Sequence, residues 1–75
     1  MSFTDKECVL AVRDLSPRQR DVLRGIAQAK STKVIADELG LSYGTVKMYR
    51  VHIYARLGIH SNGEAIRIAL AGKLI

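Results

Sequence analysis

The 75-residue chain has few of the residues that build disulfide-rich, membrane-spanning or secreted proteins. It has one cysteine, Cys8, so no disulfide can form within the chain and no zinc site can be built from thiolates. No apolar run approaches the ~20 residues that cross a bilayer. The N-terminal sequence MSFTDKECVL is acidic where a signal peptide is apolar. These absences predict a reducing, cytoplasmic setting without a membrane partner, and Cys8 is expected to be a small buried hydrophobe.

Groups suited to catalysis or metal binding are also scarce. A domain of this size has little room for a large buried cleft. The sequence shows no nucleophile beside a base and no paired acids. His52 and His60 are separated by Gly58, which does not favour a shared metal, and surface positions are expected for both. The sequence therefore predicts no enzyme, no metal site and no cofactor.

Acidic residues are absent from one long stretch. The whole chain has 12 Lys and Arg against 7 Asp and Glu, a formal net charge of +5. Between Gly40 and Gly63 there is no Asp or Glu, whereas Lys47, Arg50 and Arg56 all fall there. This balance predicts a polyanionic partner, although net charge alone does not distinguish nucleic acid from a membrane surface.

Serine caps followed by helical spacing of apolar residues predict four helices over residues 15–75. The first opens at Ser16 and Pro17, with Gln19 completing a capping box, and ends at residues 29–30. The others are opened by Ser31, Ser42 and Ser61, the last with Glu64 as a capping box. Gly40 and Gly58 end the second and third. No alternating pattern predicts a strand, so the fold class is all-α.

Residues 1–14 allow two interpretations. Thr4 and Glu7 have the spacing of a capping box that would open a short helix through Val12. A frayed arm or linker end fits equally well. The predicted organisation is therefore an N-terminal arm or short helix over residues 1–14, followed by one domain over residues 15–75.

The second and third predicted helices have the features of a helix-turn-helix. Ala36 is the small residue at their crossing, and Gly40 provides the sharp turn. Apolar side chains at Ile35, Leu39 and Val46 would hold the crossing together. At 100° per residue, the third helix, from Tyr43 to about Leu57, buries one side. Its outer side carries Gly44, Met48, Val51 and Ala55, with Lys47 at the flank.

A basic helix after such a turn is typical of a helix that enters the major groove of DNA. The positive N-terminal end of the helix would meet phosphates through the Ser42 and Thr45 hydroxyls. Lys47 suits a phosphate or a guanine edge, and Met48 suits apolar contact such as a thymine methyl. The predicted DNA-contacting residues are Lys33, Ser42, Thr45, Lys47, Met48, Val51 and Arg50, with the Arg50 head reaching a phosphate or an acid such as Asp37 or Glu38.

Residues 15–75, about four-fifths of the chain, resemble the LuxR-type (GerE/NarL-like) DNA-binding domain of bacterial transcription regulators. The motifs that match are LSPRQRDVL at 15–23, S-x-K-x-IA-x-x-L at 31–39, TVK at 45–47, IYARLG at 53–58 and S-x-x-EA at 61–65. The resemblance implies a four-helix fold whose third helix reads DNA and whose fourth pairs two subunits on inverted-repeat sites near promoters, at the bacterial nucleoid. Because such sites lie near promoters, RNA polymerase is a further candidate partner.

The chain also departs from the family pattern. Ala29 stands in place of the usual Gly, Arg50 in place of an aliphatic residue, and Val51 in place of a frequent polar or basic contact. The operator sequence therefore cannot be copied from a relative. The receiver or autoinducer-binding module that usually accompanies such a domain is absent from the sequence, which fits either a stand-alone regulator or a fragment.

The apolar last helix predicts a homodimer, because it offers more apolar surface than one small core can bury. The predicted pairing residues are Ile66, Ile68, Ala69, Leu70 and Leu74, with Ile75 extending the surface. An alternative is an interaction module that pairs with a full-length regulator without reading DNA, which the uncharged Met48, Val51 and Ala55 favour slightly. The promoter-reading domain of a sigma factor is a third interpretation, and the IYARLG and S-x-x-EA motifs argue against it.

Overall fold

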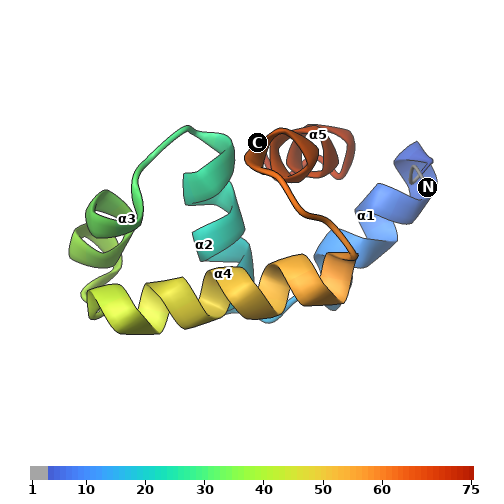
Figure 1. The fold of residues 1–75 in the computed structure, drawn as a ribbon. Helices are drawn as coiled ribbons and strands as arrows, with labels where there is room; N and C mark the ends of the chain where they lie inside the picture. The colour runs from blue at the N-terminus through green and yellow to red at the C-terminus, as the bar shows by residue number, and fades with distance from the viewer. Residues whose placement is uncertain (1–3) are drawn as a thin grey trace.

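The computed structural model describes residues 4–75, and in that range it contains five helices and no strand (Figure 1). The helices are α1 (Asp5–Asp14), α2 (Pro17–Ala27), α3 (Thr32–Leu39), α4 (Tyr43–Leu57) and α5 (Asn62–Ala71). The all-α prediction is confirmed, and the segment left undecided before residue 15 forms helix α1. The first three positions of that segment lie outside the described residues.

Each helix begins at a hydroxyl side chain that caps its first turn. At α1 the Glu7 amide donates to Thr4 Oγ1 over 3.2 Å, and the Thr4 amide donates to Glu7 Oε1 over 2.9 Å. These hydrogen bonds hold the pKa of the Glu7 carboxyl below its ordinary value. At α5 the predicted box differs, because the Glu64 carboxylate accepts from the His60 amide (2.9 Å) rather than from Ser61. Ser61 is also more extended than the other caps, with φ −140°.

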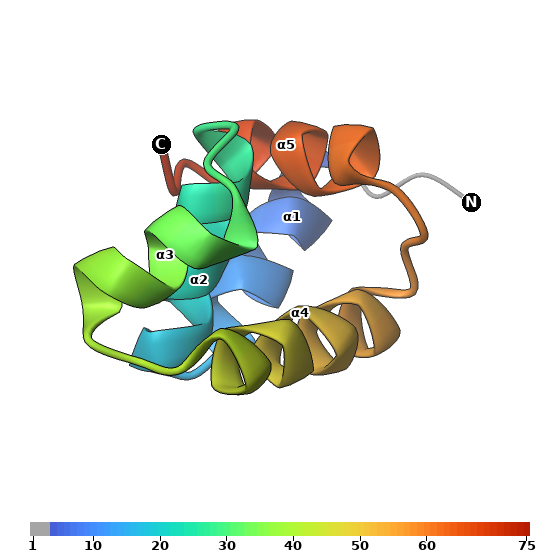
Figure 2. The same ribbon diagram turned by 60° about the vertical axis from the view of Figure 1, so that its left-hand side comes forward.

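Helix α2 lies at the centre of the molecule and packs against α3, α4 and α5, while α1 packs against α5. Figure 2 shows α2 between α5 on one side and α4 on the other. The side chains that pack together are apolar, and no polar or charged residue among residues 4–75 is buried. The largest fully buried side chains are Leu23, Ile35, Ile53, Ile68, Val22, Val46 and Cys8.

The prediction that Cys8 is a small buried hydrophobe is confirmed, because its side chain is fully buried between helices. Burial raises the pKa of the Cys8 thiol above its ordinary value of 9.0, and the nearby Arg67 guanidinium offsets part of that rise. The thiol is therefore protonated, and poorly reactive, near neutral pH.

Two glycines allow helices to approach closely. A Cβ atom at Gly72 would lie 2.6 Å from Val12 Cγ2 and 2.9 Å from the Cys8 carbonyl oxygen, where α1 crosses the end of α5. A Cβ atom at Gly25 would lie 2.7 Å from Ile35 Cγ1, where α2 meets α3. The buried Ala36 is therefore not the only small residue at the helix crossings.

A residue with a left-handed backbone conformation follows each of four helices, at Ala29 after α2, Gly40 after α3, Gly58 after α4 and Lys73 after α5. Gly40 and Gly58 have φ +68° and +67°, as predicted for glycine caps. Helix α2 ends at Ala27, two residues earlier than expected, and Ala29 has φ +62° in the turn that follows. Because a side chain at positive φ clashes with the backbone, Ala29 is strained in this turn.

Candidate nucleic-acid interface

Helices α3 and α4 pack against each other across a tight turn. Gly40 ends α3, and the Leu41 amide then donates to the Ala36 carbonyl over 2.9 Å, which closes the turn. Ile35, Ala36 and Val46 are buried where the two helices meet. The arrangement is the predicted helix-turn-helix, and it sets α4 along one side of the molecule (Figures 1 and 2).

The N-terminus of α4 is capped by two hydroxyl residues. The Thr45 amide donates to Ser42 Oγ over 3.1 Å, and the Ser42 hydroxyl donates to Thr45 Oγ1 over 2.8 Å. Each hydroxyl has one proton to donate, so Ser42 uses its proton in the cap while the Thr45 proton remains free for a ligand. The first amides of a helix have no intrahelical acceptor, so this end of α4 carries partial positive charge.

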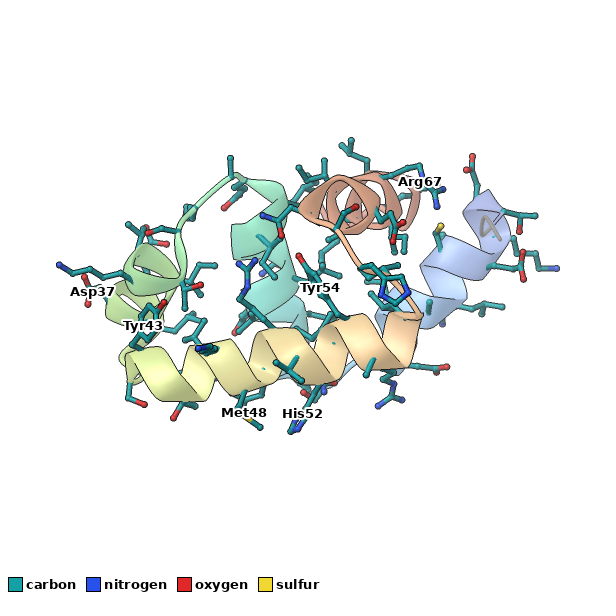
Figure 3. The ribbon with its side chains drawn as sticks, viewed as in Figure 1. Asp37, Tyr43, Met48, His52, Tyr54 and Arg67 are labelled. Atoms are coloured by element: carbon teal, nitrogen blue, oxygen red, sulfur yellow. The ribbon has the colours of Figure 1, made fainter. Side chains whose placement is uncertain are left out.

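The outer face of α4 is exposed and partly apolar. Met48 is 52% exposed and Val51 is 54% exposed. In Figure 3, Met48 and His52 point away from the other helices. Val46, Ile53 and Leu57 form the buried side, as predicted from helical spacing. A shallow hollow of ≈ 590 Å³ runs beside the exposed face, lined by Ser42, Gly44, Thr45, Met48, Tyr49 and His52.

The lysines of this region are exposed. Lys47 lies on the flank of the outer face, and Lys33 lies in the first turn of α3. Within residues 4–75 neither takes part in an ion pair. His52 and His60 are exposed as well, and no three His, Cys, Asp or Glu side chains in this range gather as a metal site. The two lysines are therefore free to meet an anionic ligand.

The acidic partners predicted for Arg50 were wrong. Its Nη2 donates to Asn62 Oδ1 over 2.9 Å, and its guanidinium lies 5.8 Å from the centre of the Tyr54 ring. The Tyr54 hydroxyl donates to the same Asn62 oxygen, and in Figure 3 Tyr54 points from α4 toward α5. Arg50 lies on the flank of α4 that faces the start of α5, so it binds there rather than at Asp37 or Glu38.

Glu38 has a different partner, Lys30, at 2.7 Å between Oε1 and Nζ. The three-residue cluster of Arg50, Tyr54 and Asn62 ties α4 to α5 and was missed in the sequence. Asn62 was visible there only as part of a capping segment. Nothing in helical spacing shows that two residues on one helix converge on the first residue of the next.

The residues predicted for pairing fall on two sides of α5. Ile68 and Ala69 are fully buried within the monomer, so their predicted place in a dimer interface is corrected. They lie on the side of α5 that packs against α1 and α2. Ile66 and Leu74 are half-buried and Leu70 is 56% exposed, with Ile75 43% exposed beyond the helix.

Comparison with known proteins agrees with this geometry. Residues 13–69 match the family described as bacterial regulatory proteins, luxR family. The chain belongs to the luxR family. Among its relatives, the transcriptional regulatory protein FixJ of Bradyrhizobium diazoefficiens is 33% identical over 64 residues, covering 85% of this chain and 31% of the relative. The fimbriae Z protein of Salmonella typhimurium is 39% identical over 61 residues, covering 81% of this chain and 29% of the relative.

The fold has a counterpart among solved structures. A crystal structure of full-length FixJ from B. japonicum aligns with 95% of this chain at a TM-score of 0.82 and 30% identity, and 35% of that chain is covered. The luxR-family chain thus spans less than a third of the length of the two relatives named above. Family membership confirms the resemblance found in the sequence, and a family of regulatory proteins confirms that the chain is not an enzyme. No described helix is long and apolar enough to span a membrane.

Proposed function

We propose that this chain is the DNA-binding part of a bacterial transcription regulator, with α4 in the major groove and α5 pairing two copies on inverted-repeat sites. The observation that carries the proposal is the outer face of α4. This face belongs to the second helix of a helix-turn-helix, and it carries no Asp or Glu. Lys47 lies on the face and takes part in no ion pair within residues 4–75. A protein that reads chromosomal operators works at the nucleoid, where RNA polymerase is a further candidate partner.

The predicted contacts divide by role. Contacts to phosphates fix the position of a protein on DNA without reading the base sequence. Groups that carry positive charge or a free hydrogen-bond donor suit such contacts, and these are Lys33, Thr45 and the first amides of α4. Ser42 supports them through the cap. Lys47 and Met48 suit base edges. Arg50 is held by Asn62, so we assign it to orienting α4 rather than to a phosphate.

The test of DNA reading is a selection of bound sequences from random DNA, followed by titration of the selected duplex. Lys47→Ala should weaken binding by about 1–3 kcal/mol if Lys47 reads a base, or lower the salt slope by about 1 if it contacts a phosphate. Lys6→Ala is the charge-matched control, because Lys6 is an exposed lysine of α1 on another part of the surface. Equal affinity and salt slope in both variants would remove Lys47 from the interface.

Pairing is tested separately with two exposed leucines. Leu70→Glu should abolish the dimer in sedimentation and weaken binding to a duplex with two half-sites, while a single half-site is bound as before. Leu10→Glu places the same charge on α1 at a leucine that is 50% exposed and should leave the dimer intact. Half-sites about one helical turn apart, ~34–36 Å, are expected for such a dimer. A wild-type chain that stays monomeric on a two-site duplex at high concentration would refute pairing through α5.

One observation favours a second function. The outer face of α4 carries Met48, Val51 and Ala55, which are uncharged, and such a face suits a protein partner as well as a groove floor. The chain would then pair with a full-length regulator through α5 without reading DNA. Fluorescence anisotropy on the selected duplex at two salt concentrations separates the cases, because weak binding that ignores sequence supports the second function.

A further inference from the structure

The outer face of α4 has an uncharged stripe with cations beside it. At about 100° per residue, four of its residues fall within one narrow sector along the helix. They are Gly44, Met48, Val51 and Ala55, all exposed. Lys47 flanks this stripe on one side, and His52 flanks it on the other with Arg56 further round the helix; all three are exposed. The charge of this helix therefore lies at the edges of its exposed face and not at its centre.

We infer that this stripe reads thymine methyl groups at adjacent base pairs, so that the centre of the half-site is rich in A·T pairs. The inference rests on the proposed function and names the sequence class that the site prefers. The methyl group of thymine is the one apolar group that the four bases present in the major groove. A Met or Val side chain forms no strong hydrogen bond with any base edge, so apolar contact is the discrimination available to it.

The spacing along the helix fits neighbouring base pairs. Met48 and Val51 are three residues apart, about 4.5 Å along the helix axis, and successive base pairs rise by about 3.4 Å. The unbranched Met48 side chain has three rotatable bonds, which allows it to adapt to the remaining offset. Gly44 and Ala55, at the two ends of the stripe, are small enough for the helix to approach the groove floor.

The surrounding charges favour DNA as the occupant. Phosphates line both edges of a major groove; Lys47 borders the stripe on one side, and Arg56 lies beyond His52 on the other. The absence of Asp and Glu from residue 40 to residue 63 removes repulsion from those phosphates. It also leaves the stripe without a carboxylate to accept from the cytosine amino group, which lowers its preference for C·G pairs.

The experiment compares thymine with uracil, which lacks only the methyl group. Sequences are selected from a random duplex, and the enriched half-site is then synthesised with each thymine replaced in turn by deoxyuridine. One lost methyl contact should weaken binding by the wild-type chain about fourfold. Met48→Ala should abolish the difference between thymine and uracil at one base pair, and Val51→Ala should abolish it at the neighbouring base pair. Leu10→Ala is the control, because it truncates an exposed leucine of α1 and should keep the full sensitivity to uracil.

The possible results distinguish a failure of methyl reading from a failure of the proposed DNA-binding function. An enriched sequence bound equally well with thymine and with uracil refutes methyl reading and leaves sequence-specific DNA binding intact. An enriched half-site with C·G pairs at its centre refutes it in the same way. If selection enriches no sequence, the proposed function itself fails. Loss of uracil sensitivity in the Met48 and Val51 variants, but not in the Leu10 variant, supports methyl reading at adjacent pairs.

Discussion

The close contact of α1 with the end of α5 at Gly72 predicts the sign of two matched substitutions. Gly72 follows α5 at the point where α1 crosses it, and Gly63 lies in the first turn of the same helix. We expect Gly72→Ala to destabilise the chain and Gly63→Ala to stabilise it. Neither glycine has a positive φ angle, so the backbone accepts alanine at both sites and only the surroundings differ.

The magnitude follows from the contacts that a new methyl group would make. At position 72 it would lie 2.6 Å from Val12 Cγ2 and 2.9 Å from the carbonyl oxygens of Cys8 and Ile68. The Cys8 oxygen is backbone of α1 and the Ile68 oxygen is backbone of α5, so relief requires both α1 and the end of α5 to shift. Such overpacking costs about 1–3 kcal/mol. Reduced freedom of the unfolded chain offsets about 0.4–1 kcal/mol. We therefore expect a net loss of about 1–2 kcal/mol.

The outcome at position 63 should be opposite, because the nearest atom to a new methyl group there is Ser61 Oγ at 3.9 Å. The gain should be about 0.5–1 kcal/mol from helix propensity and the unfolded chain. Urea and thermal unfolding followed by circular dichroism measure both, with Tm moving about 4–8 °C for each kcal/mol. A Gly72→Ala variant as stable as Gly63→Ala would refute the described seating of α1 on α5.

Three further predictions concern stability and the orientation of α4. Ala29→Gly should raise the free energy of unfolding by up to about 1 kcal/mol in urea titrations, because φ +62° costs a residue with a side chain roughly 1–2 kcal/mol; a loss would show that position 29 is unstrained. Arg50→Met should remove the bond to Asn62 while leaving the salt slope of DNA binding unchanged, and a slope lower by about 1 would show that Arg50 contacts a phosphate. Since the folded thiol of Cys8 holds its proton more tightly than the unfolded one, stability should fall as pH rises past about 9.0, and Cys8→Ala should flatten that fall in urea titrations across this range.

Local sequence features predicted the helices well, because the signals that start and stop a helix lie within a few residues. Ser16 with Gln19 and Ser42 before Tyr43 form the expected caps, and Gly40 and Gly58 take the expected left-handed conformation. The buried and exposed sides of α4 followed from helical spacing for the same reason. Short-range chemistry was sufficient for each of these elements.

Features that depend on two distant segments were not predictable in this way. All the apolar residues of α5 resemble one another in the sequence, and only the packing of α1 and α2 shows that Ile68 is core while Leu70 is exposed. The partner of Arg50 likewise depended on the angle between α4 and α5. The contact at Gly72 required knowing that residues 5–14 form a helix at all, which the sequence left open.

The attachment of α1 has a mechanical consequence for control of this chain. Among the described helices, α1 packs chiefly against α5, whereas α3 and α4 pack against each other and against α2. A pull or a binding event acting on α1 therefore reaches the proposed pairing helix directly and reaches the proposed reading helix, α4, mainly through the other helices. An input delivered through the N-terminal helix would act first on whether two copies assemble, and the choice of DNA sequence by each copy would be left largely as it was.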